Sequence, residues 1–310
     1  MIVDFHTHIF PPDVRQRREE YIRRDPTFAE MYANPRAKIA TAEELLHSME
    51  ECGVDVSVAL GFAWREHELC RRHNDYLLES AANSGGRIVP FCTVNMLADL
   101  AAVTKEVARC TAAGARGLGE LRPESQGWDL NGEPGERLAA LAARWSLVLL
   151  FHVTEPIGHD YPGKQGLRLD SFYKFAAAHP KLKIVGAHLG GGLPFLNRLE
   201  YQMATWSENV CVDTAAWNLI YRSYRNILAL LHAWGPARTL FGSDFPLVTQ
   251  ASARRLIERS KKEARHLPIW GARRFDYELR YVLGDNARVL LGLGTRWDRI
   301  GTSDRQDPAQ

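Results

Sequence analysis

The stretch LVLLFH at residues 147–152 decides the fold class, because an unbroken apolar run ends there in a histidine. A continuous apolar run of this length fits a strand of a parallel sheet that is buried on both faces. Helical patterns stand on either side of it, at 136–145 and 171–180. A strand between two helices is the unit from which α/β folds are built.

The same unit recurs along the chain. Strands are predicted at 2–5, 54–60, 87–94, 115–120, 147–152, 182–188, 208–213 and 238–244. Helices are predicted between them at 41–52, 68–84, 99–114, 136–145, 171–180, 193–206, 224–234 and 251–265. Eight strand–helix units predict an α/β fold of the (β/α)8 TIM-barrel type, as one domain over residues 1–295. A doubly wound open sheet is the alternative, although no G-x-G-x-x-G follows the first strand.

Two segments fall outside the repeated unit. Residues 9–40, after the first strand, form a long excursion rich in arginine and aromatic residues. A segment this long in a compact domain is usually a lid or a binding element, so we expect a lid-like insertion. Residues 296–310 are polar, and we expect a loose C-terminal tail there.

The composition is that of a soluble globular protein, with 45% hydrophobic residues, 25% charged residues and a net charge of +2. This balance gives no reason to expect nucleic acid or a membrane as a partner. Five scattered cysteines without a C-x-x-C pair favour reduced thiols. The N-terminal stretch has no signal-peptide pattern, and no apolar run approaches the ~20 residues of a membrane span. We expect a cytoplasmic enzyme with a small-molecule substrate, and leave a homo-oligomer open.

The stretch VDFHTH at 3–8 places two histidines at the end of the first predicted strand. Side chains at i and i+2 of a strand share a face, so His6 and His8 are expected to project the same way. Neighbouring imidazoles pack poorly in a core but are good metal ligands. Taken alone, such a pair is more often a surface feature without a role.

Single polar residues end four later strands: Glu120, His152, His188 and Asp244. The active site of a TIM barrel lies at the carboxyl ends of its strands, so these side chains and the two N-terminal histidines should converge. Each one alone has a simpler interpretation as a rim or turn residue, and Glu120 could instead pair with Arg116 or Arg122. The convergence of six donors favours a metal site.

Imidazole and carboxylate donors suit a divalent metal, and the absence of thiolates argues against a closed structural zinc site. Zn²⁺ is the first expectation, with Mn²⁺, Fe²⁺ or Ni²⁺ as alternatives. A metal with open positions can lower the pKa of a bound water and so make a nucleophile. Asp244 could accept the proton of that water, and His188 could be a ligand or a general acid–base.

The motifs FHTH, AHLGGG, FGSDFP and GDNARVLLGL resemble the amidohydrolase superfamily, in particular its amidohydrolase-2 branch of metal-dependent hydrolases and decarboxylases. The resemblance covers about residues 1–295. It implies a divalent metal held by His6, His8, His152 and Asp244. His188 then matches a histidine that binds a second metal in binuclear members and is catalytic in mononuclear ones.

Many members bridge two metals with a carbamylated lysine on the fourth or fifth strand. Neither predicted strand carries a lysine here, and Glu120 resembles instead the metal-binding glutamate of TatD-type hydrolases. One ion is therefore expected, with two as the alternative.

The loops that follow the strands carry candidate substrate-binding residues: Arg65, Arg122, His159, Tyr161 and Lys164. Arginine or lysine at such places would recognise a carboxylate or phosphate, which points to an anionic substrate. For any one of them, an ordinary solvated loop residue is the simpler interpretation.

These residues predict a metal-dependent hydrolase that uses metal-activated water to cleave an amide, lactone or ester-like bond, with Asp244 and His188 as catalytic residues. The alternative is a lyase, a metal-dependent non-oxidative decarboxylase of an aromatic or unsaturated carboxylic acid. Glu120 favours the hydrolase, because an added anionic ligand suits hydroxide formation better than the binding of an anionic substrate. A TatD-type phosphodiesterase or nuclease and a non-catalytic metal-binding barrel are further alternatives.

Overall fold

The structure is a computed structural model, and it describes residues 1–164, 166–196, 209–221, 234–264 and 279–294. Most of the predicted helices at 193–206 and 224–234, and the tail at 296–310, lie outside these residues.

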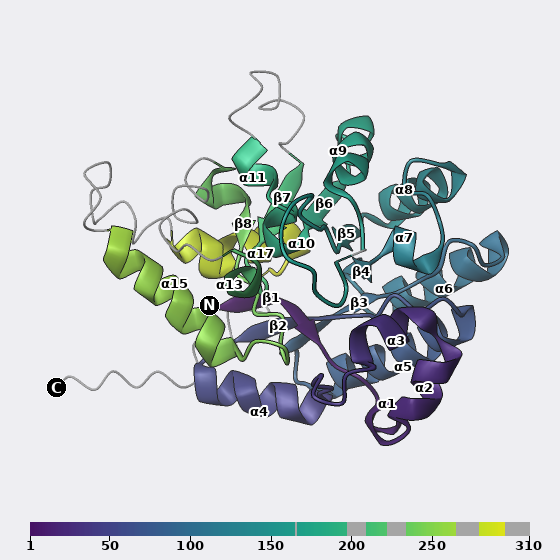
Figure 1. Cartoon of the computed structure of the whole chain (residues 1–310), viewed down its shortest axis with the longest axis horizontal. Coiled ribbons are helices and arrows are strands. Elements are labelled where there is room, and N and C mark those ends of the chain that lie inside the picture. The colour runs from purple at the N-terminus through teal and green to yellow at the C-terminus, as the bar shows by residue number, and fades with distance from the viewer. Residues whose placement is uncertain (165, 197–208, 222–233, 265–278, 295–310) are drawn as a thin grey trace.

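Eight parallel strands form one sheet in chain order (Figure 1). They are β1 (Val3–His8), β2 (Val56–Leu60), β3 (Ile88–Cys92), β4 (Gly117–Leu121), β5 (Val148–Phe151), β6 (Lys183–Gly186), β7 (Val210–Asp213) and β8 (Thr239–Leu240). The sheet closes on itself, because the backbone N–H of Phe5 donates to the carbonyl of Phe241 and that of His8 to Phe245, both at 2.7 Å. The predicted (β/α)8 barrel is confirmed.

Helices follow the strands and cover the outside of the barrel. The longer ones are α4 (Ala42–Cys52), α5 (His67–Asn83), α6 (Leu100–Ala112), α8 (Glu133–Trp145), α9 (Leu169–Ala178), α15 (Gln250–Ala264) and α17 (Asn286–Leu291). The shorter ones are α7 (Pro123–Gln126), α10 (Ala187–Gly190), α11 (Leu193–Leu196), α13 (Trp217–Ile220), η1 (Pro236–Arg238) and η2 (Tyr281–Asp285). Among the described residues, none of these helices has the length and apolar character needed to cross a bilayer.

β3, β5, β6 and β8 end one to four residues earlier than the sequence predicts. β6 ends at Gly186, because the next residues turn into α10 with His188 and Leu189 in the left-handed region at φ 57° and 56°. β8 is only two residues long, and Asp244 after it also has a positive φ of 67°. The polar residues predicted to end β6 and β8 therefore sit on turns just past them.

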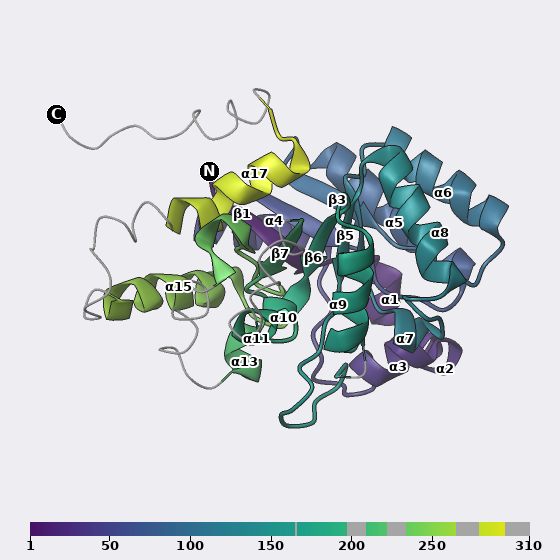
Figure 2. The ribbon, with the colours of Figure 1, turned by 90° about the horizontal axis from the view of Figure 1, so that it is seen from above.

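The packing of the barrel leaves one end for the site. A buried cluster of strand side chains, with Phe5, Val58 and Leu150 among them, continues onto Ala287 and Leu291 of α17. Figure 2 shows α17 at one end of the barrel and α10 and α13 at the opposite end. The loops and short helices that follow the strands gather at that opposite end.

The excursion after β1 folds into three short helices, α1 (Pro12–Gln16), α2 (Arg18–Arg24) and α3 (Pro26–Tyr32). The carboxylate of Asp25 caps α3 by accepting from the backbone N–H groups of Thr27 and Phe28. Phe28 stacks on Trp64, with ring centroids 5.1 Å apart, inside a buried aromatic cluster. Because Trp64 follows β2, this cluster docks the insertion on the barrel.

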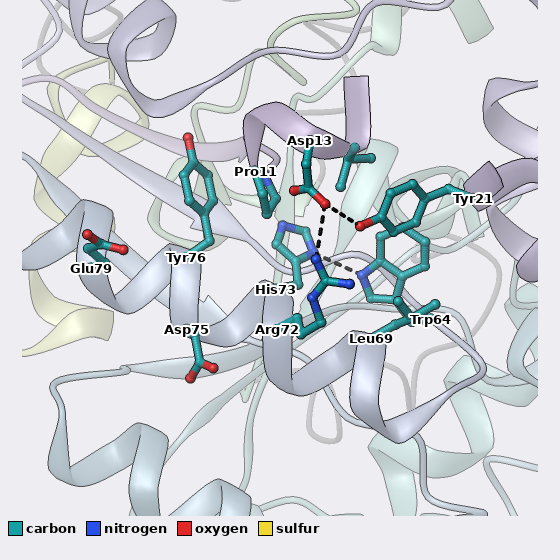
Figure 3. A pocket seen from close by; sticks show the side chains of 11 residues that line it. Pro11, Asp13, Tyr21, Trp64, Leu69, Arg72, His73, Asp75, Tyr76 and Glu79 are labelled. Atoms are coloured by element: carbon teal, nitrogen blue, oxygen red, sulfur yellow. Dashed lines mark hydrogen bonds and ion pairs between the residues drawn. The ribbon is translucent and has the colours of Figure 1, made fainter. Parts of the chain in front are cut away.

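A cavity of about 290 Å³ lies between the insertion and α5. Figure 3 shows that Asp13 points toward both Tyr21 and Arg72 in this cavity. The Tyr21 hydroxyl donates to the Asp13 carboxylate at 2.6 Å, and the Arg72 guanidinium donates to it at 3.0 Å. The polar groups at the heart of this cavity therefore satisfy one another.

His73, on the wall of this cavity, is a core residue. Its Nδ1 accepts from the indole N–H of Trp64 at 3.1 Å and from the backbone N–H of Phe62 at 3.2 Å. Its Nε2 donates to the carbonyl of Ile9 at 2.8 Å. Burial lowers the pKa of His73 to about 4, so the ring is neutral at physiological pH.

Candidate metal centre

β1 carries both N-terminal histidines into the site. The register between β1 and β2 shifts between Asp4 and Thr7, which marks a bulge. The Thr7 hydroxyl donates to the carbonyl of Val58, whereas the Nε2 atoms of His6 and His8 lie only 3.1 Å apart. The two imidazoles share a side of the strand, as their spacing predicts.

Glu120, at the end of β4, lies among the four histidines. Its Oε1 is 2.9 Å from Nδ1 of His152 and 3.3 Å from Nε2 of His188. The same oxygen is 3.7 Å from Nε2 of His6, and Oε2 is 3.5 Å from Nε2 of His8. Among the described residues, Glu120 makes no ion pair with Arg116 or Arg122, so its carboxylate belongs to the histidine cluster.

Asp244 completes the set of six predicted donors. Its Oδ1 is 3.4 Å from Nε2 of His8 and 3.7 Å from Nε2 of His6. Three groups of ligand atoms each fall within 4.8 Å of one another: His6, His188 and Asp244; His6, His8 and Glu120; Glu120, His152 and His188. We call these six residues the donor cluster. It could hold one divalent ion or two.

The hydrogen bonds of three histidines fit metal ligation. His6 has Nδ1 at 2.8 Å from Asp213, which leaves Nε2 facing the cluster. His152 has Nε2 at 2.9 Å from the carbonyl of Gly163, and Nδ1 faces the cluster. His188 has Nδ1 at 3.0 Å from a carbonyl of the loop after β7, and Nε2 faces the cluster. When the outer nitrogen donates its proton, the inner nitrogen keeps the lone pair that a metal needs.

Asp213, at the end of β7, orients two members of the donor cluster. Its side chain is fully buried, and Oδ2 binds Nδ1 of His6. Its Oδ1 accepts from the backbone N–H of His188 at 2.9 Å and of Ala215 at 3.0 Å. An aspartate at the end of a strand can also serve only as a turn residue, but these contacts are those of a carboxylate that orients metal ligands.

The charges of the donor cluster favour a cation. Although burial opposes protonation, the carboxylates of Asp213, Glu120 and Asp244 raise the pKa of His6 to about 10. Burial would raise the pKa of Glu120, yet the charges of His152 and His6 hold it well below its usual range. Buried carboxylates that remain ionised are stabilised by nearby positive charge, which a divalent metal supplies in concentrated form.

Arg122 is the predicted substrate-binding residue that the structure ties to the donor cluster. Its Nη2 donates at 2.9 Å to the carbonyl of Gly163, which is also the partner of His152. The same Nη2 lies 3.2 Å from the carboxylate of Glu30 on α3.

The other predicted substrate-binding residues bond within the loops after the strands. The Arg65 guanidinium donates to a backbone carbonyl at 2.8 Å. The Tyr161 hydroxyl donates to Glu155 at 2.7 Å, and Lys164 donates to the carbonyl of His159 at 2.9 Å. No contact among the described residues joins these four side chains to the donor cluster.

The amidohydrolase family profile matches residues 3–293. The chain belongs to the amidohydrolase family. This membership confirms the resemblance drawn from the FHTH, AHLGGG and FGSDFP motifs. It also supports the prediction that the protein is an enzyme. No curated protein matches the sequence.

Similar solved structures cover nearly the whole barrel. The 5-carboxyvanillate decarboxylase of Sphingomonas paucimobilis is 18% identical with a TM-score of 0.69, over 94% of this chain and 98% of that one. The 2,6-dihydroxybenzoate decarboxylase of Rhizobium is 17% identical with a TM-score of 0.69, over 94% and 98%. The 5-carboxyvanillate decarboxylase of Novosphingobium aromaticivorans, complexed with manganese and 4-hydroxy-3-methoxy-5-nitrobenzoic acid, is 15% identical with a TM-score of 0.71, over 94% and 96%. At these identities the likeness shows the fold.

Proposed function

We propose that this member of the amidohydrolase family is a metal-dependent, non-oxidative decarboxylase of an aromatic carboxylic acid. The observation that carries the proposal is the donor cluster, with the cationic Arg122 tied to it through Gly163. The similarity to decarboxylases of substituted benzoic acids over 94% of the chain supports this reaction over the hydrolysis that the sequence favoured. The manganese in one of those structures makes Mn²⁺, in place of Zn²⁺, the first metal to test.

We assign the metal ligands to residues of the donor cluster: His6, His8, Glu120, His152 and Asp244. When bound, a divalent cation supplies positive charge that stabilises the anionic oxygens of the substrate. The burial of His6, Glu120, His152 and Asp244 keeps bulk water away from that charge and so strengthens its effect.

We assign His188 as the proton donor. Decarboxylation breaks the bond between the ring carbon and the carboxylate, releases CO₂ and leaves the electron pair on the ring carbon, which must take up a proton. Nε2 of His188 faces the cluster, while Nδ1 stays bonded to the backbone. Despite burial, the hydrogen bond and charge of Glu120 raise the pKa of His188, which favours the protonated ring. The proton that His188 gives up returns from solvent.

The test is product analysis with the Mn²⁺-loaded protein. We expect 2,6-dihydroxybenzoate or 5-carboxyvanillate to release CO₂, and in D₂O the ring carbon that lost the carboxylate should carry deuterium. His188→Gln should keep its Mn²⁺ content and lose most of the turnover. Hydrolysis of lactones, esters or amides, with no CO₂ from either aromatic acid, would contradict the proposal.

A metal-dependent hydrolase is the second candidate, and the position of Glu120 favours it. Its carboxylate lies inside the donor cluster, where a negative charge works against the binding of an anionic substrate. In that reaction Asp244 would accept the proton of the attacking water. A lactone and ester panel, run beside the CO₂ assay, separates the two candidates.

A further inference from the structure

Arg122 has hydrogen-bonding capacity that the fold does not use. Its side chain is 3% exposed, and its Nε and Nη1 have no hydrogen-bond partner among the described residues. Only Nη2 is engaged, by the carbonyl of Gly163 at 2.9 Å and by both carboxylate oxygens of Glu30 at 3.2 Å. Buried donors without a partner are costly, so this geometry calls for a ligand that accepts hydrogen bonds.

Arg122 lies directly against a member of the donor cluster. His152 and Arg122 share the carbonyl of Gly163, and both lie beside Gly166. A Cβ at Gly166 would come within 2.2 Å of Cδ2 of His152 and 3.2 Å of Nε of Arg122. The unused Nε–H of Arg122 therefore stands next to His152, a proposed metal ligand.

The insertion contributes a second unused donor, the hydroxyl of Tyr32 at the end of α3. The Tyr32 side chain is nine-tenths buried and stacks on Phe28, with ring centroids 4.6 Å apart. Its hydroxyl has no hydrogen bond to a described residue. Its ring centroid lies 5.4 Å from that of Phe10, which follows His8 of the donor cluster by two residues, and Glu30 of the same helix pairs with Arg122 at 3.2 Å. Burial raises the pKa of Tyr32, so the hydroxyl keeps its proton.

We propose that Arg122 and Tyr32 form a carboxylate-binding subsite beside the donor cluster. A guanidinium can only donate hydrogen bonds, and the protonated phenol donates one as well, so the ligand that satisfies both is an oxygen anion. Glu30 shares the guanidinium and competes with that anion. The subsite rests on the proposed function, because its ligand is the carboxylate of the aromatic acid. The insertion, which the sequence predicts to be lid-like, thus also contributes to substrate recognition.

The test measures binding apart from turnover. The Mn²⁺-loaded protein is titrated by calorimetry with 2,6-dihydroxybenzoate and with resorcinol, which has the same ring without the carboxylate. Tyr32→Phe should weaken the binding of 2,6-dihydroxybenzoate about tenfold, the effect of one hydrogen bond to a charged group, and leave that of resorcinol unchanged. Arg122→Gln should weaken it more. Glu30→Gln should tighten it, a change of opposite sign that a merely structural role would not produce.

Tyr21→Phe is the matched control, because it removes a phenol of the same insertion that donates to Asp13 in the cavity of Figure 3. It should bind both probes as the wild type does. If Arg122→Gln does not fold, Tyr32→Phe and Glu30→Gln still decide the question.

The outcomes separate the subsite from the reaction. Binding of 2,6-dihydroxybenzoate that depends on Tyr32 without release of CO₂ supports the subsite and contradicts the decarboxylase. Release of CO₂ with unchanged affinity in Tyr32→Phe overturns the subsite and leaves the decarboxylase standing. Wild-type protein that binds neither 2,6-dihydroxybenzoate nor 5-carboxyvanillate also overturns the subsite.

Discussion

The cavity under the insertion and the donor cluster at the end of the barrel both bury histidines, but they treat the rings in opposite ways. At the cavity, both ring nitrogens of His73 are bonded to the protein, and burial lowers its pKa to about 4. In the cluster, Nδ1 of His6 bonds to Asp213 while Nε2 faces His8 and the carboxylates of Glu120 and Asp244, and the surrounding carboxylates raise the pKa of His6 to about 10 despite burial.

The difference lies in the partners of the rings, because both are almost fully buried. A ring with both nitrogens satisfied and no carboxylate beside it is a neutral part of the core. A ring that is oriented through one nitrogen and directs the other toward carboxylates can bind a cation. Substitutions in the two regions should therefore differ in their effects on metal binding and on stability.

Glu120→Gln should have the largest effect. The substitution keeps the shape of the side chain but removes the charge that His6, His152 and His188 face. We expect the affinity for Mn²⁺ to fall by at least about 100-fold, since even residues that only support ligands are worth 10–100-fold. Calorimetric titration with Mn²⁺ checks this. Added Mn²⁺ should also raise the Tm of the wild type and leave that of the variant unchanged. A folded variant that binds Mn²⁺ like the wild type would contradict the assignment.

Asp213→Asn should weaken Mn²⁺ binding by about 10–100-fold, because it removes the charged acceptor that orients His6 and the backbone of His188. The Mn²⁺ electron paramagnetic resonance spectrum should change as well, since the ligand geometry relaxes. The loss should affect turnover more than substrate affinity. Unchanged metal affinity in a folded variant would reduce Asp213 to a turn residue.

His73→Gln should change the pH dependence of stability and leave metal binding alone. The pKa of His73 is about 4 when folded against 6.5 when unfolded, so the unfolded chain takes up the proton first. His73 therefore costs no stability above pH 6.5, and its cost grows as the pH falls toward 4, to about 3 kcal/mol at most. Glutamine can still donate and accept hydrogen bonds but cannot titrate. Urea unfolding should show that the free energy of unfolding falls less between pH 7 and pH 5 in the variant than in the wild type. Equal decreases would contradict the assignment of this pH dependence to His73.

Glu66→Gln should have the smallest effect. Glu66 pairs with Arg24 of α2 at 2.5 Å, but both side chains are well exposed. Such a pair contributes only about 0.2–1 kcal/mol, so unfolding in urea should shift little. A loss above about 2 kcal/mol would show that this pair, and not the aromatic cluster around Phe28 and Trp64, docks the insertion.

The sequence predicts most of the barrel and the grouping of its donors, because each apolar run forms one strand and the strands end at one face. His6 and Glu120 could be placed in this way without knowing a single contact. The ends of β6 and β8 could not, since His188 and Asp244 have positive φ values that depend on tertiary contacts.

The role of Tyr32 was also beyond the sequence. It stands among several aromatic residues of the insertion, and nothing in that pattern separates Tyr32, whose hydroxyl has no partner among the described residues, from the rings that only pack. The helices α1–α3 are short, and their apolar side chains are buried against Trp64 from another loop. Their structure therefore depends on contacts distant in the sequence.

Whether the donor cluster binds a divalent metal can be measured as metal content. The wild-type chain, loaded with Mn²⁺ and dialysed, should retain at least one ion per chain by elemental analysis, while a folded His6→Asn variant should retain almost none and His73→Gln should match the wild type. A wild-type chain that retains no divalent metal, or a His6→Asn variant that retains as much as the wild type, would contradict the account.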